Sequence, residues 1–298
     1  MDTLREIFDP GFLLRNSVYI SLLVGFACPL VGVYLILRRL VFMGVALPQI
    51  SSCGIAFAFA VPGGWGLIDH MHQGHFAGDE HTLAFIGSTV FTLTAILILA
   101  FLERRGRGLA EGRIGTAYVL AGAWSILLLV KNPLGERGLL DLLKGEIIAI
   151  SNFDLGLTAG TFLIVMVVLF LFNKEFLLVS FDREMAVTLK KNVLVWDFLL
   201  FLMIGLTISM SVLSVGPLVA FGFLLIPPLT AHLFARNMRQ FALFAACMGG
   251  FTAIIGFCLA YRWDYPVGPT DVALLGVLYA VAFIGRKIYL GFRTIQAH

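Results

Sequence analysis

Histidine and carboxylate side chains concentrate in one short polar segment of an otherwise apolar chain. Four of the six histidines lie there, between two long hydrophobic runs. Imidazole and carboxylate groups at this density are typical ligands of Zn²⁺, Mn²⁺ or Fe²⁺. The spacing matches no zinc-finger or protease motif, so the alternative is a polar loop that is merely rich in histidine. The candidate metal ligands are His70, His72, His75, Asp79, Glu80 and His81.

The composition indicates which elements position this segment. Hydrophobic residues make up 59% of the 298 residues and charged residues 13%, about half the charged share of a soluble domain. Several apolar stretches reach the roughly 20 residues that a helix needs to cross a lipid bilayer. We therefore predict an all-α, polytopic membrane helical bundle, with residues 1–298 forming one transmembrane domain. The small net charge of +3 indicates no nucleic-acid partner.

About nine spans are expected, or eight if one segment is a half-helix. Of the 21 lysines and arginines, 15 fall in one alternating set of connections, and the other set holds the remaining 6. The positive-inside rule places the larger set in the cytoplasm, so the histidine-rich segment faces outward and the C-terminus inward. A short surface helix is expected at 139–148 on the outer side. The expected spans are 17–37, 43–62, 85–102, 114–130, 155–172, 194–214, 218–235, 241–260 and 270–286.

Motifs for catalysis are absent from the chain. It contains neither the G-x-x-x-x-G-K-[ST] sequence of a P-loop nor the H-E-x-x-H sequence of a zinc protease. Ionisable residues inside a span are functional candidates by default. Asp197 and Asp271 fall near span ends without an obvious partner, so we interpret both as boundary residues. The chain is thus predicted to be a conduit and not an enzyme.

Two cytoplasmic segments could contact a partner protein. In the stretch 180–191, Phe181, Met185 and Leu189 recur every four residues, which predicts an amphipathic helix along the membrane surface. The second segment, 232–240, follows a span that contains Pro217, Pro227 and Pro228. Those prolines indicate either a broken helix beside a transport path or a kinked packing helix.

Five short motifs, in order along the chain, resemble those of the zinc/manganese/iron ABC importer permeases. The stretch 216–231, which includes Leu-Leu-Ile-Pro-Pro, resembles the "LLIPPA" signature of that family. The vitamin B12 and siderophore importer permeases resemble the chain more distantly. The other four motifs are Arg38-Arg39-Leu40 followed by Gly44, the "DLLxGxIL"-like stretch 140–148, Phe181-Asp182 with Glu184 and Ala186, and Tyr265-Pro-Val-Gly-Pro-Thr-Asp271.

This resemblance implies the permease subunit of an ABC importer in a bacterial cytoplasmic membrane. The family pairs two permeases, here expected as a homodimer, with cytoplasmic ATPase subunits and an external solute-binding protein. ATP is then hydrolysed by a partner chain, no cofactor is bound tightly, and a divalent metal ion (Zn²⁺, Mn²⁺ or Fe²⁺) is the expected cargo. The resemblance assigns ATPase contacts to the 232–240 turn and the nearby 180–191 segment, specifically to His232, Arg236, Asn237, Arg239, Asp182 and Glu184.

One position departs from the family pattern. Members commonly carry Asp and His four residues apart after the arginine pair, on one helix face where both could bind a divalent cation. Here Val45 and Gln49 occupy those positions. The expected lining of the transport route is therefore neutral: Gln49, Ser51, Ser52 and Cys53. This departure favours the alternative of an importer for a metal chelate or other organic solute. A membrane scaffold subunit that transports nothing is a separate alternative.

Overall fold

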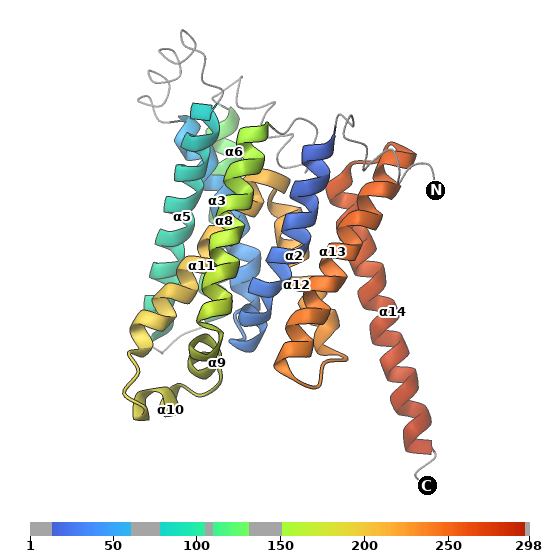
Figure 1. Ribbon diagram of the computed structural model, residues 1–298. Coiled ribbons are helices and arrows are strands. Elements are labelled where there is room, and N and C mark those ends of the chain that lie inside the picture. Colours follow the sequence, from blue (N-terminus) through green and yellow to red (C-terminus); the bar gives the residue numbers. More distant parts are fainter. Residues whose placement is uncertain (1–13, 61–77, 105–109, 131–150, 296–298) are drawn as a thin grey trace.

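The computed structural model describes residues 14–60, 78–104, 110–130 and 151–295, and every element within them is helical (Figure 1). Nine of these helices coincide with the nine expected spans, and the short helices α9 and α10 lie together at one end of the bundle. The elements are α2 (Arg15–Leu37), α3 (Val41–Ala60), α5 (Gly78–Arg104), α6 (Ala110–Val130), α8 (Asn152–Leu171), α9 (Asn173–Phe181), α10 (Arg183–Thr188), α11 (Val193–Val215), α12 (Pro217–His232), α13 (Met238–Trp263) and α14 (Val267–Ile295).

The helix lengths confirm a polytopic membrane bundle. Among the described residues, seven helices are long and apolar enough to cross a bilayer, and α6 and α12 are shorter apolar helices. At 1.5 Å per residue, the 16 residues of α12 reach about 24 Å, less than the roughly 30 Å of a hydrocarbon core. The surface helix expected at 139–148 lies outside the described residues.

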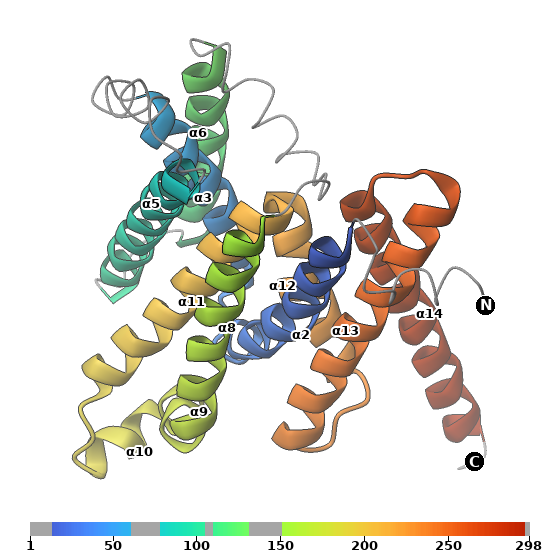
Figure 2. The same cartoon turned by 45° about the horizontal axis from the view of Figure 1, so that its top comes forward.

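The centre of the bundle is formed by α2, α3, α11 and α12. About 70% of the most apolar window of α2, α3 and α11 is buried, against 22% for α8 and 17% for α14. Figure 2 shows α2 and α12 between a group of α3, α5 and α6 on one side and α13 with α14 on the other. Exposed side chains such as Phe170 and Val281 give the outer helices an apolar surface suited to lipid.

The basic connections meet at one end of the bundle, as their alternation predicts. Arg38, just after α2, hydrogen-bonds to Ser180 at the end of α9. Val33, in the last turns of α2, packs with Phe241 at the start of α13. The Arg38–Arg39 corner, the α9–α10 segment and the α12–α13 turn therefore share one end, which the charge bias assigns to the cytoplasm.

Helix α12 runs unbroken through Pro227 and Pro228, which supports the packing interpretation of these prolines. Because proline has no N–H, Pro228 leaves the carbonyl of Leu224, four residues earlier, without its helical donor. The backbone of Gly32 in α2 lies against that same carbonyl and against the Pro228 ring. Because Gly32 has no side chain, α2 can approach the freed Leu224 carbonyl of α12 closely.

The same device recurs between α2 and α13. Pro29 in α2 frees the carbonyl of Gly25, and the backbone of Gly249 in α13 lies against it. Two of the central helix contacts therefore join a proline-freed carbonyl on one helix to a glycine on its neighbour. Such close approach is typical of membrane helices. Their association depends on van der Waals packing and not on the hydrophobic effect, and small residues allow the backbones to pack closely.

Candidate functional site

Buried hydroxyl groups gather where α3, α5 and α11 meet. Ser51 Oγ and Ser88 Oγ share a hydrogen bond of 2.6 Å, and Ser88 Oγ also lies 3.4 Å from the carbonyl oxygen of Ser209. All three side chains are buried, and the Ser209 hydroxyl has no hydrogen-bond partner among the described residues. This hydroxyl cluster is a neutral polar site inside the membrane-spanning part of the bundle.

The four residues expected to line a transport route do not share one face of α3. Ser51 faces α5, while Gln49, about 200° away around the helix, lies against Gly122 of α6. Ser52 and Cys53 are buried among the neighbouring helices. The structure therefore places Ser51 in the hydroxyl cluster and separates it from Gln49.

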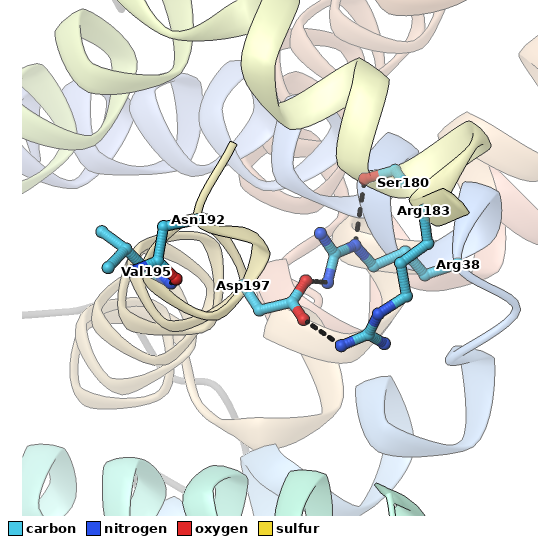
Figure 3. A network of polar contacts seen from close by, with 6 residues as sticks. All are labelled: Arg38, Ser180, Arg183, Asn192, Val195 and Asp197. Carbon is cyan, nitrogen blue, oxygen red and sulfur yellow. Dashed lines mark hydrogen bonds and ion pairs between the residues drawn. The ribbon is translucent and has the colours of Figure 1, made fainter. Parts of the chain in front are cut away.

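At the cytoplasmic end, four side chains form a connected polar cluster (Figure 3). Arg38 donates from Nε to Ser180 Oγ at 3.0 Å and from Nη1 to Asp197 Oδ1 at 2.8 Å. Arg183 donates from Nη2 to the other oxygen, Asp197 Oδ2, at 3.0 Å. The Arg38 guanidinium also lies 5.5 Å from the ring centre of Phe201, within cation–π range.

This cluster ties four helices together at a membrane boundary. Arg38 follows α2, Ser180 belongs to α9, Arg183 opens α10, and Asp197 lies in the first turns of α11. The side chains of Arg38 and Asp197 are only 10% and 6% exposed, whereas Arg183 is 56% exposed. A carboxylate buried this deeply requires its charged partners, so the inner ion pair holds α2 against α11.

The expectation that Asp197 and Asp271 are ordinary boundary residues without partners is wrong, because both are buried and paired. Asp197 has the two arginine partners just described, and Asp271 in α14 is fully buried, with Ser21 of α2 donating a hydrogen bond of 3.4 Å. Sequence inspection missed the Arg38–Asp197 pair because the two residues are 159 positions apart in the chain. The available signal was that both fall at the cytoplasmic ends of spans, hence at the same depth.

The segment 180–191 is not the single amphipathic helix that its periodicity predicts. Helix α9 ends at Phe181, and α10 begins at Arg183. Between them, the Asp182 carboxylate accepts a hydrogen bond from the backbone N–H of Met185 at 2.8 Å. Because Asp182 caps a new helix, it breaks the register of the old one. Its carboxylate thus has a local structural role, and Glu184 is exposed beside it.

The α12–α13 turn, residues 233–237, is held by a reciprocal cap. The Asn237 side chain accepts from the backbone N–H of Gln240 at 2.9 Å, and Gln240 Oε1 accepts from the N–H of Arg236 at 3.2 Å. The His232 ring packs edge-on against Phe241, with 5.6 Å between centroids. The turn is therefore a fixed element that leaves Arg236 and Arg239 exposed.

The metal-binding interpretation of the histidine-rich segment stays a prediction. His70, His72 and His75 lie outside the described residues, as do the side chains of the three remaining candidates in the first turn of α5, Asp79, Glu80 and His81. Within the part of the chain that the structure describes, no three His, Cys, Asp or Glu side chains are placed to hold a metal ion.

The sequence matches one family model over most of its length. The model, described as the ABC 3 transport family, covers residues 12–286. Among relatives, the manganese import system permease protein ScaB of Streptococcus gordonii is 24% identical over 270 residues, covering 91% of this chain and 90% of that protein. The manganese transport system membrane protein MntD of Bacillus subtilis is 27% identical over 279 residues, 89% of each chain.

The fold also matches a solved structure. PsaBC from Streptococcus pneumoniae in complex with Fab contains a chain that superposes with a TM-score of 0.78 at 22% identity, covering 95% of this chain and 94% of that one. At this identity the likeness establishes the fold alone. Both the sequence family and the helical arrangement therefore agree along nearly the whole chain.

Proposed function

Because the chain belongs to the ABC 3 transport family, we propose that it is the membrane permease of a bacterial importer for a divalent metal ion such as Mn²⁺ or Fe²⁺. The observation that carries this proposal is the match of 12–286 to the family, together with the seven long and two shorter apolar helices of the described residues and their likeness in fold to a solved chain. Relatives named for manganese import or manganese transport support the choice of cargo. The chain has no P-loop, so a partner ATPase supplies the energy.

The α12–α13 turn is the element best built to receive force from that ATPase. Its reciprocal cap makes it rigid, and Arg236 and Arg239 project from it. The turn connects directly to α12, which contacts α2 through the Gly32 backbone. Movement of the turn would therefore reach the centre of the bundle. In this proposal the permease works as a homodimer, and its outer loops meet a solute-binding protein.

The route through the bundle is proposed to use the hydroxyl cluster. The Ser51 and Ser88 hydroxyls and the Ser209 carbonyl offer oxygen ligands, but such neutral groups hold a divalent cation more weakly than carboxylate and imidazole do. A site that binds the cation weakly allows it to pass through the bundle, whereas a tight site would retain it. The second candidate, import of a metal chelate, is favoured by Val45 and Gln49 at the positions where the family commonly has Asp and His.

Uptake into proteoliposomes tests these two candidates. The permease is reconstituted with its ATPase and binding protein, and ATP-dependent uptake of free Mn²⁺, Fe²⁺ and Zn²⁺ is compared with that of the same metals in chelated form. Uptake of free ions supports the first candidate, and uptake only of a chelate supports the second. If the binding protein does not stimulate ATPase activity and neither form is transported, the chain is a scaffold.

The histidine-rich segment is proposed to collect the cation at the outer mouth. Changing His70, His72, His75 and His81 together to Ala should raise the metal concentration for half-maximal uptake, without changing ATPase binding. Weak Zn²⁺ or Mn²⁺ binding should decline below about pH 6, as imidazole becomes protonated. If uptake by the variant equals that of the wild type at limiting metal, the segment is a polar loop without a role in metal binding.

A further inference from the structure

A cavity of about 580 Å³ opens beside the Arg38–Asp197 cluster at the cytoplasmic end. Its volume lies within the roughly 300–1,000 Å³ range of small-ligand sites. Among the described residues, three arginines line it, Arg38, Arg39 and Arg183, and one acidic residue, Asp197. The lining therefore carries an excess of positive charge, which favours an anionic ligand.

Arg39 stands out because its backbone conformation is costly for arginine. Its φ is 58°, in the left-handed region that favours glycine, and it ends α2 in a Schellman motif, with Leu40 N–H donating to Leu35 O at 2.8 Å. Replacing Arg39 by glycine would remove this conformational cost, which changes the folding equilibrium constant by about a factor of ten. The exposed arginine side chain is thus not explained by the turn, and it lines the cavity.

Arg183 supplies a second guanidinium to the same cavity. It engages Asp197 through one nitrogen, and more than half of its side chain is exposed. A guanidinium carries five N–H donors in a planar fork that matches the oxygens of a phosphate. Arg38, by contrast, is buried and engaged with Asp197 and Ser180, so it forms the wall of the cavity, and Arg39 and Arg183 are the more exposed arginines of the lining.

The surroundings of the cavity are apolar and lie at the level of the membrane surface. Leu40 and Phe181 line it together with the arginines. Next to it, Met185 and Leu189 at α10 and Leu194 at the start of α11 are more than half exposed. A short helix with exposed apolar side chains beside charged ones is typical of an element lying in the interface of a bilayer.

We propose that this cavity binds the phosphate group of an anionic phospholipid from the cytoplasmic leaflet, held by Arg39 and Arg183. Basic pockets between transmembrane helices on the cytoplasmic side are suited to such headgroups, and anionic lipids are concentrated there. The apolar residues beside these arginines favour a lipid over an acidic side chain of a partner protein, because a lipid brings acyl chains with its phosphate. The proposal depends on the cytoplasmic placement of this end and not on which cargo is transported.

The bound lipid would brace the corner where α2, α9, α10 and α11 meet. Thermal unfolding of the purified full-length permease in mild detergent tests this, with added phosphatidylglycerol compared with phosphatidylcholine and with inorganic phosphate. Native mass spectrometry counts retained lipid in the same samples. Phosphatidylglycerol should raise the unfolding midpoint of the wild type, whereas the other two additions should not.

Substitutions of the two outer arginines assign the effect to the cavity. Arg39→Gly relieves the left-handed backbone and removes the charge, so it should retain or improve basal stability while weakening phosphatidylglycerol binding roughly tenfold. Arg183→Gln should weaken it similarly. Arg286→Gln, at an exposed position of α14 away from the cavity, is the matched control and should behave as wild type.

Three results would overturn the proposal. The first is an undiminished phosphatidylglycerol effect in both Arg39→Gly and Arg183→Gln. The second is equal stabilisation by inorganic phosphate, which would identify a free-anion site. The third is no lipid effect combined with loss of ATPase copurification in the variants, which would identify an acidic residue of the ATPase as the ligand. None of these measurements involves metal uptake, so their outcome is independent of whether the proposed import function is correct.

Discussion

The contact between α2 and α12 predicts a large effect from adding a single methyl group. In Gly32→Ala, the new Cβ would overlap the carbonyl oxygen of Leu224 and would lie 2.9 Å from its carbonyl carbon and 3.0 Å from Pro228 Cγ. Carbon atoms in ordinary contact are about 3.5–4.0 Å apart. The obstructing atoms belong to the backbone and to a proline ring, which cannot rotate away, so the helices must separate by about 1 Å.

The cost follows from two opposing effects. Overpacking a closely packed interface typically costs about 1–3 kcal/mol, and a clash with backbone belongs at the upper end. Replacing glycine by alanine inside a helix stabilises the helix by about 1 kcal/mol. We therefore expect Gly32→Ala to destabilise the permease by about 2 kcal/mol. ATP-driven uptake should fall too, because α12 carries the proposed coupling turn.

Gly160→Ala in α8 is the matched control. Within the part of the chain that the structure describes, no neighbouring atom lies within 4 Å of the Cβ that it would add, so only the helix-propensity gain applies. The two variants should thus differ by about 3 kcal/mol in free energy of unfolding. The assay is thermal unfolding in detergent, read as the fraction of monodisperse protein, with Gly32→Ala melting several degrees below Gly160→Ala. Equal midpoints for the two variants would refute the close approach of α2 to the Leu224 carbonyl.

Three further predictions concern the cytoplasmic end and the orientation of the chain. Asp197→Ala should cost about 3–5 kcal/mol of stability, because it leaves the buried Arg38 without its carboxylate, while Arg183→Gln should cost under about 1 kcal/mol at its exposed position; similar thermal unfolding midpoints would contradict this ranking. Arg236→Glu combined with Arg239→Glu should abolish ATPase copurification and uptake, and retention of both would remove the turn from the coupling face. In a cysteine-free background, Arg262→Cys should react with an impermeant thiol reagent added outside spheroplasts, and Arg239→Cys should not. The reverse labelling pattern would show that the chain has the opposite orientation in the membrane.

The spans and their alternation could be read from the sequence because each depends on local properties. A stretch of about 20 apolar residues can satisfy its backbone in lipid only as a helix, whatever its neighbours are. This is why all nine expected spans coincide with helices of the structure. Lysine and arginine are equally informative, since each reports the side of the membrane on which its own connection lies. The Asp182 cap shows the limit, because a four-residue periodicity did not reveal the helix break that one side chain makes.

Contacts between distant residues were decided by the tertiary structure alone. Asp197 looked like a residue without a partner because its arginine lies 159 positions away, at the end of another helix. Gln49 and Ser51 are close in sequence, but the placement of α6 and α5 around α3 separates them. The role of Gly32 is also invisible locally, since it depends on a carbonyl that Pro228 frees on α12. Local chemistry determines that these segments are helices in a membrane, whereas the pairing of charges, hydroxyls and freed carbonyls depends on which helix faces become neighbours.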